Sequence, residues 1–231
     1  MKNSSKLNQK NKIKIIPMTL DDIDELELWQ KKYGDTIFFD TIREFILEGD
    51  TIRDFRELID TNYTFVPIGS RERKFSFVAK NEKEEIVAWF LCMVFKDKRK
   101  EGLDEIAQLF DDDYDDESTS SVDFYTRDNE DTIYSMFMQY LVVHPMQQGR
   151  GLGPQIAREM IFNSQNYVGV QPDEFFGYIH KDNHQSQKVF RNFGFKFVPK
   201  NDPNYIQTIA TLPELEKKAG INRTKPQEFG E

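Results

Sequence analysis

The sequence predicts a mixed α/β fold, of the α+β kind, in which one central sheet is flanked by helices. Two nearly uninterrupted apolar runs, Ile86 to Phe95 and Ile133 to Val143, have the length and composition of central strands that are buried on both faces. After the second run, Ile156, Ala157 and Met160 recur at helical spacing. Strands and helices that alternate in this way indicate a domain built around a mixed sheet.

The elements before the first apolar run follow from local signals. Two aspartates directly after Thr19 give a helix-start signal, and alternating apolar residues predict strands. In order, we expect a strand (Lys12–Met18), a helix from Thr19, one broken or two short helices (Thr41–Leu47 and Thr51–Ile59) and a strand (Phe75–Ala79) joined to the first apolar run by a hairpin turn at Asn81–Glu85.

The elements after the second apolar run repeat the strand and helix pattern. A glycine-rich turn and the helix with Ile156 come first, and the sheet is then completed. The remaining elements are a strand (Glu174–Ile179), a helix (Gln185–Phe193) and two closing strands (Phe195–Pro199 and Tyr205–Leu212). We expect a flexible N-terminus at 1–11, a single domain at 12–212 and a C-terminal tail at 213–231.

Composition excludes several classes of protein. The 231 residues carry 31 Lys plus Arg against 40 Asp plus Glu, a net charge of −9, which argues against a nucleic-acid partner. No apolar stretch is long enough for a membrane span, and the polar start lacks the apolar core of a signal peptide, so we expect a cytoplasmic protein with no membrane partner. Cys92 is the single cysteine, which excludes an internal disulfide.

The negative charge is concentrated between Asp97 and Asp131. This segment holds 14 acidic and 4 basic residues, 4 − 14 = −10, so the other residues sum to −9 + 10 = +1. It lies between two predicted strands, which indicates a long insertion loop that self-repulsion keeps open. A solvated loop without a function is one interpretation, and a surface that attracts cationic amines is another.

The turn after the second apolar run has the composition of a phosphate cradle. Glycines at 149, 151 and 153 let successive N–H groups point into one concavity, and the helix that follows adds its positive end. The turn lacks the Gly-Lys-Ser/Thr of a P-loop, and Pro154 stands where a dinucleotide fingerprint needs its last glycine. The sequence therefore predicts a diphosphate site of another kind, or a connector without a ligand.

Two motifs in this region resemble those of the GNAT superfamily of acyl-CoA N-acyltransferases. Gln148-x-x-Gly151-x-Gly153, after Val143-x-Pro145, is similar to the acyl-CoA signature of the family. One strand later, the pattern Asn183-x-x-Ser186-x-x-x-Phe190-x-x-x-Gly194-Phe195 resembles the family's second motif at the same spacing. The resemblance covers residues 133–195 and implies a mostly antiparallel sheet that is splayed between its fourth and fifth strands.

The resemblance also implies how acetyl-CoA, as co-substrate, would be held. The pantetheine arm would pair with the main chain of the fourth strand, and backbone N–H groups of the turn would bind the diphosphate. Asn183 would hydrogen-bond the pantetheine or acyl region, although an N-cap of the following helix explains it equally well. The implied coenzyme-binding residues are Leu141, Val142, Val143, Gln148, Gly149, Arg150, Gly151, Leu152, Gly153 and Asn183.

Catalytic groups are the least defined part of the predicted site. The tyrosine that often protonates the thiolate in this family is replaced here by Phe190, and the fourth strand contains no acid. Gln139, the only amide in its apolar run, could orient a water, or it could be a hydrogen-bonded core amide. Tyr178 is a remaining hydroxyl that could face the cleft. No metal is expected, because His180 and His184 are too isolated to form a ligand set.

Three functions therefore stay open. The first is an N-acetyltransferase in which a primary amine, from a small molecule or a protein and favoured as a cation by the acidic loop, attacks acetyl-CoA directly. The second is an acyl-CoA-binding sensor without turnover, which the Phe190 substitution keeps open. The third is an interaction protein that acts through its acidic loop. The sequence does not define the acceptor, the length of the acyl group or the oligomeric state.

Overall fold

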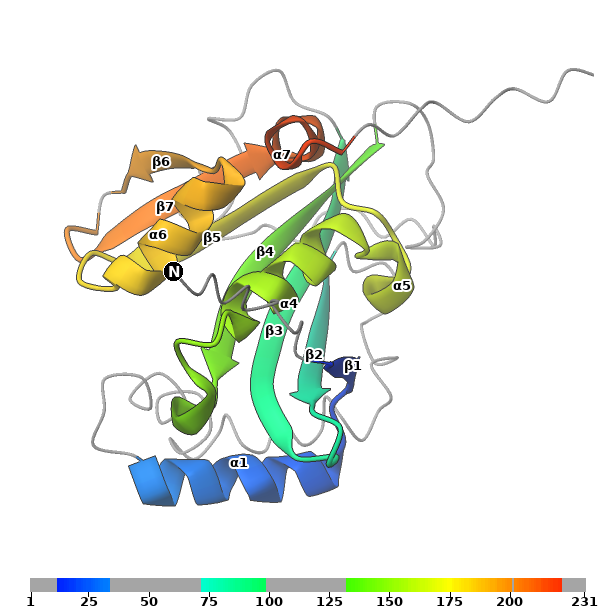
Figure 1. Ribbon diagram of the computed structural model, residues 1–231. Helices are drawn as coiled ribbons and strands as arrows, with labels where there is room; N and C mark the ends of the chain where they lie inside the picture. Colours follow the sequence, from blue (N-terminus) through cyan, green and yellow to red (C-terminus); the bar gives the residue numbers. More distant parts are fainter. Residues whose placement is uncertain (1–11, 34–71, 99–131, 201, 222–231) are drawn as a thin grey trace, which may run out of the picture. The chain divides into compact units, whose positions relative to one another are not determined.

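The computed structural model describes residues 12–33, 72–98, 132–200 and 202–221, which form a seven-stranded sheet flanked by helices (Figure 1). The strand order is β1-β2-β3-β4-β5-β7-β6. Strands β4 and β5 pair in parallel, whereas the pairs β1–β2, β5–β7 and β6–β7 are antiparallel. The predicted mixed sheet with flanking helices is thereby confirmed.

The bounds of the strands agree closely with those expected from hydrophobic pattern. The strands are β1 (Lys14–Pro17), β2 (Glu72–Lys80), β3 (Ile86–Lys98), β4 (Thr132–Val143), β5 (Glu174–His180), β6 (Lys196–Pro199) and β7 (Tyr205–Thr211). The helices are α1 (Leu20–Tyr33), α4 (Leu152–Phe162), α5 (Gln165–Val168), α6 (His184–Phe193) and α7 (Leu212–Ala219), and Pro145–Gln147 forms one turn of 3-10 helix. No described helix is long and apolar enough to cross a membrane.

The chain forms two compact units. The first comprises residues 1–60, 76–90 and 141–156, and the second comprises residues 61–75, 91–140 and 157–231. The first unit holds β1, α1, the hairpin between β2 and β3, and the glycine turn. The second holds β5, β6, β7, α6 and α7 with the greater part of β4. The expectation of one domain at 12–212 stays a prediction.

In the first unit, α1 is fixed against the β2–β3 hairpin by polar contacts at its N-terminus. The Thr19 hydroxyl and N–H both donate to Asp22 Oδ2 at 2.8 Å, which is an N-terminal capping arrangement that the helix-start signal predicted. The same carboxylate binds Lys80 of β2 at 2.8 Å, and this contact raises the pKa of Lys80. Asp22 is buried, so the ion pair compensates a charge that would otherwise be costly there.

In the second unit, β5 pairs with β7 along its whole length, and the two faces of this ribbon differ. On one face Gly177 and Thr208 lie beside the ring of Phe190, which belongs to α6. The opposite face carries Phe176 and Ile209, around which Phe95, Phe137 and Val198 pack. Because successive strand residues alternate between faces, Tyr178 belongs to the Phe176 face.

Helix α7 replaces the first part of the predicted C-terminal tail. Thr211 and Glu214 form a capping box at its start, with Pro213 in the first turn, and Gly220 ends it with a φ of 68°. The carboxylate of Glu214 also binds Lys196 at 2.7 Å, which is the main cause of its lowered pKa. The sequence contains these capping signals, but the helix has only 8 residues, so its hydrophobic pattern is too short to predict it. The predicted helices at 41–47 and 51–59, and the acidic loop beyond Lys98, lie outside the described residues.

Candidate coenzyme and catalytic site

The turn after β4 takes the conformation that its glycines allow. Gly149 and Gly151 have φ values of 73° and 80°, in the left-handed region that other residues avoid. Both are exposed, and a Cβ at either position would meet nothing within 4 Å. In the described part of the chain, neither glycine N–H donates a backbone hydrogen bond. The turn therefore presents main-chain donors to the outside, as an anion site requires.

Helix α4 continues this surface from Leu152 onward. The N–H groups in the first turn of a helix lack intrahelical partners, and they carry the positive end of the helix dipole. Gln155 N–H closes the first turn by donating to Gly151 O at 3.1 Å. Pro154 stands in that turn and has no N–H to lose, which agrees with its predicted place. The glycine turn therefore continues directly into α4, whose first residues are Leu152 and Gly153.

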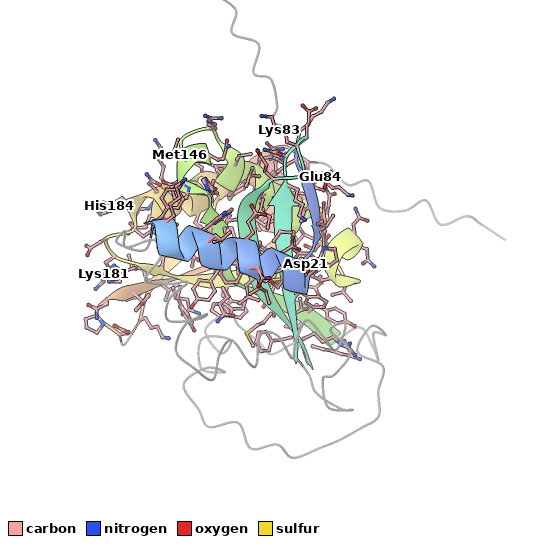
Figure 2. All side chains as sticks on the ribbon, turned by 90° about the horizontal axis from the view of Figure 1, so that it is seen from below. Asp21, Lys83, Glu84, Met146, Lys181 and His184 are labelled. Carbon is pink, nitrogen blue, oxygen red and sulfur yellow. The ribbon has the colours of Figure 1, made fainter. Side chains whose placement is uncertain are left out.

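Side chains of the turn hold its shape. Gln148 Nε2 donates to the carbonyl of Val143 at 3.2 Å, which closes the turn onto the end of β4. Arg150 donates to Gln147 Oε1 at 3.0 Å, which links two side chains of the turn. Met146 projects from the same turn with 66% of its surface exposed (Figure 2). Val142 is buried, whereas Leu141 and Val143 are half-buried.

His144 connects the turn to α1. Its N–H donates to Val87 O at 2.9 Å, and its Nδ1 accepts from the N–H of Met146 at 3.1 Å. The rings of Trp29 and Tyr33 meet the imidazole edge-on, with centroid distances of 4.6 and 5.3 Å. Burial, followed by the nearby Lys32, lowers the pKa of His144, so a neutral imidazole with an acceptor at Nδ1 is favoured.

The parallel strands β4 and β5 separate part-way along their length. Their pairing comprises Ser135 with Glu174, Met136 with Phe175 and Phe137 with Phe176. Within the described residues it stops there, although β4 runs on to Val143 and β5 to His180. The main chain of β4 after Phe137 is thus not paired with β5. An extended ligand could pair with it as an added strand would.

Gly177 marks the position at which the separation begins. A Cβ built there would lie 3.1 Å from the carbonyl oxygen of Met138, which is tighter than ordinary contact. The absence of a side chain lets the β4 backbone approach β5 this closely just beyond the last paired residues. No local pattern singles out this glycine, because the register of β4 against β5 decides its role.

The two candidate catalytic residues occupy the start of this separation. The ring of Tyr178 lies 5.4 Å from that of Phe137, and its hydroxyl oxygen is buried. Gln139 has the strand parity of Phe137 and is half-buried. Within the described residues its amide makes no hydrogen bond, so the structure does not show the hydrogen-bonded core amide that was its alternative interpretation.

The second motif is placed on α6. Asn183 caps the helix, because its Oδ1 accepts from the N–H of Ser186 at 3.0 Å. This is the N-cap role that the sequence allowed, and the coenzyme contact of Asn183 stays a prediction. Phe190 packs edge-on against Phe195 at a centroid distance of 4.7 Å. Its ring is therefore part of the packing between α6 and the Gly177 face, opposite to Tyr178.

Comparison with known proteins identifies the fold. No protein-family model matches the chain, and no curated protein matches it by sequence. Mutant forms of the spermidine/spermine N-acetyltransferase SpeG from Vibrio cholerae superpose with a TM-score of 0.51 at 9% identity, covering 90% of this chain and 98% of that one. The fold is the GNAT fold. This is the fold that the two sequence motifs implied.

Two further GNAT-fold structures resemble the chain less closely by TM-score. A GNAT-family acetyltransferase from Streptococcus agalactiae gives 0.49 at 14% identity, covering 86% of this chain and 95% of that chain. NAA60 from Arabidopsis thaliana, in complex with a bisubstrate analogue, gives 0.48 at 14% identity with the same two coverages.

Sequence reasoning missed three residues of the separation between β4 and β5. Besides Gly177, these are Lys200, whose ammonium lies 3.8 Å from the centroid of the Tyr178 ring, and Gln207, which is paired with Tyr178 across β5 and β7. Both lie in the last part of the GNAT fold, beyond the second motif. A strand register would have been needed to find them, and no local pattern supplies one.

Proposed function

We propose that the chain transfers the acetyl group of acetyl-CoA to a primary amine by direct attack. The observation that carries this proposal is the exposed turn at 148–153, with two left-handed glycines and a helix start, at the end of a strand that has separated from its parallel neighbour. The GNAT fold supports the same function. Residues 141–143 would pair with the pantetheine arm, and the turn would bind the diphosphate.

Acetyl-CoA supplies an activated acyl group as a thioester. The chain's own residues must orient it, stabilise the developing oxyanion and provide a proton for the departing thiolate. Tyr178 carries a hydroxyl at the start of the strand separation, and Gln139 carries an amide on the same face. We assign proton transfer to Tyr178 and the orientation of a water to Gln139, because Phe190 has no proton to give.

The coenzyme site is tested by Gly151→Asp. At this position a side chain meets open space, so the substitution adds backbone strain and a negative charge where the diphosphate is expected. We expect acetyl-CoA binding, measured by calorimetry, to fall at least about 100-fold, since diphosphate and carboxylate repel at short range.

A matched control for this variant is Gly220→Asp. Gly220 has a φ of 68°, also meets nothing within 4 Å of an added Cβ, and caps α7 rather than the turn. Gly220→Asp therefore adds the same backbone strain and the same negative charge, but at a position outside the proposed diphosphate site. Equal affinities of the two folded variants would refute the coenzyme assignment, and no binding by the native chain would refute the function.

The catalytic assignment is tested by Tyr178→Phe at saturating acetyl-CoA. Loss of a placed acid should lower kcat on the order of 10²-fold with little change in coenzyme affinity. Gln139→Ala should lower kcat less, and Phe190→Tyr should leave it within about a factor of ten. The measurement is release of free CoA with a panel of amines. Unchanged kcat in both Tyr178→Phe and Gln139→Ala would remove these residues from the mechanism.

A coenzyme-binding protein without turnover is the second candidate function. The packing of Phe190 against Phe195 favours it, because an apolar ring fills the place of the family's usual proton donor. The same CoA-release experiment separates the two functions. Binding of acetyl-CoA without release of CoA for any amine would support the second.

A further inference from the structure

A lysine of the chain itself lies against the candidate catalytic tyrosine. Lys200 follows the end of β6, and its ammonium nitrogen lies 3.8 Å from the centroid of the Tyr178 ring. This distance is well within the range of a cation–π interaction. Among the residues that the structure describes, Lys200 forms no ion pair, and its side chain is half-buried. The Tyr178 ring is therefore placed to attract this ammonium.

The ring that holds Lys200 lies where β4 and β5 separate. The last paired residues are Phe137 and Phe176, and Tyr178 is the next residue of β5 on the same face. Its ring contacts Phe137 at 5.4 Å. A primary amine is thus placed at the start of the strand separation, beside the tyrosine to which the proposed function assigns proton transfer.

A buried hydrogen-bond donor lies on the same face. Gln207 is the partner of Tyr178 across β5 and β7, and Val198 is its partner on β6. The residue is only 4% exposed, and its Nε2 has no hydrogen-bond partner in the described part of the chain. Leaving such a donor unsatisfied is costly. A carbonyl oxygen placed against this face would give it an acceptor.

We propose that Lys200 is an acetyl acceptor of the chain itself, so that the protein acetylates a lysine beside its own proposed catalytic tyrosine. This proposal rests on the proposed function. The neutral Nζ attacks the thioester carbonyl carbon, a C–N bond forms, and the C–S bond breaks. CoA leaves as the thiolate and takes up one proton, and the nitrogen gives one proton to water. The product is an Nζ-acetyl-lysine, which has no charge to offer the Tyr178 ring.

The experiment is to incubate the full-length chain with acetyl-CoA and map acetyl-lysine by peptide mass spectrometry. The matched control site is Lys181, an exposed lysine in the turn after β5 (Figure 2). Because a positioned amine reacts far faster than a free one, the acetylated fraction of Lys200 should exceed that of Lys181 at least about tenfold. Lys200→Arg should remove the signal while acetyl-CoA binding stays unchanged.

Two variants separate enzymatic transfer from spontaneous acetylation. Gly151→Asp should abolish modification of Lys200, whereas Gly220→Asp should retain it. Tyr178→Phe removes the hydroxyl assigned to proton transfer but keeps the ring, whereas Tyr178→Leu removes both, so Tyr178→Leu should reduce modification of Lys200 further than Tyr178→Phe does while calorimetry shows native coenzyme affinity. A readout without coenzyme is labelling by acetic anhydride, which should modify Lys200 more slowly than Lys181 in the native chain and equally fast in Tyr178→Leu.

The outcomes distinguish this proposal from the proposed function. If the chain binds acetyl-CoA and acetylates added amines but Lys200 is modified no more than Lys181, only the present inference is overturned. Equal modification of Lys200 in the native chain and in folded Gly151→Asp would also overturn it, since the transfer would then be spontaneous. Absence of acetyl-CoA binding by the native chain would overturn both.

Discussion

His144 holds the start of the glycine turn through one ring nitrogen. Its Nδ1 accepts from Met146 N–H, and protonation would convert this acceptor into a donor and break the contact. The ring is enclosed by Trp29 and Tyr33, and the charged groups that act on it are Lys32, which lowers its pKa, and Glu85, which raises it. Burial is the largest cause, and the net direction is downward.

This arrangement predicts a pH dependence with a defined sign. Because the pKa of His144 is lowered on folding, its contribution to the free energy of unfolding is complete above the unfolded pKa of about 6.5 and is lost as the pH falls below it. We expect His144→Asn, which keeps a capping oxygen but cannot titrate, to lose less stability than the native chain between pH 7 and 5.

The measurement is urea unfolding of both proteins at the two pH values, together with NMR titration of the histidine ring protons. Using the difference between the two proteins cancels the titration of other groups such as Glu25, whose pKa burial raises. An imidazole of His144 that titrates above the ordinary pKa of about 6.5 would contradict the assignment of a neutral ring.

At the scale of elements, the separation of β4 and β5 depends on a close main-chain approach at Gly177. Thr208 of β7 lies beside the same position, 3.5 Å from an added Cβ, and its hydroxyl donates to Gly177 O at 3.2 Å. A side chain would therefore press on β4 from a strand that β7 holds firmly. The backbone oxygen of Met138 would have to move.

We expect Gly177→Ala to destabilise the chain by about 1–3 kcal/mol, the usual cost of overpacking in a buried site. Gly153→Ala is the control, because an added Cβ there meets only the Val143 side chain at 3.6 Å and α4 gains helix propensity. Chemical unfolding measures both. Equal free energies of unfolding for the two variants would show that the β4 backbone moves away from the added methyl group without a loss of stability.

The elements that sequence could predict are those with a strong local signal. The apolar runs that become β3 and β4 and the capped helix α1 agree with their patterns, and the glycine turn has the backbone angles that its composition requires. The end of β4–β5 pairing at Phe137 and Phe176 was implied only by the family resemblance. The contacts of Lys200 and Gln207 depend on strand register, which joins residues distant in sequence and leaves no local pattern.

For the whole molecule, the largest electrostatic feature is the acidic segment 97–131. It carries a net charge of −10 in a chain whose total is −9, so the remainder is near neutral. Most of the segment lies outside the described residues, but its two ends are defined by the end of β3 at Lys98 and the start of β4 at Thr132. The glycine turn follows the other end of β4. The segment is thus rooted at the end of β4 that is still paired with β5.

This placement predicts that the segment favours cationic acceptors over neutral ones at low salt. A concentrated negative charge raises the local concentration of cationic amines, and the effect must weaken as salt rises, because exposed charges are screened beyond about 8 to 10 Å at physiological ionic strength. The test is deletion of Lys98 to Asn129 with a short Gly/Ser bridge, with kcat/KM measured for a diamine and a neutral amine at low and high salt. At low salt, we expect the deletion to lower kcat/KM for the diamine and to leave kcat/KM for the neutral amine unchanged. At high salt, the two proteins should have the same kcat/KM for the diamine, because the charges are screened. If the folded deletion variant keeps the native preference and the native salt dependence, the segment is a solvated insertion, and the preference for cations must come from the face of the sheet that carries Tyr178.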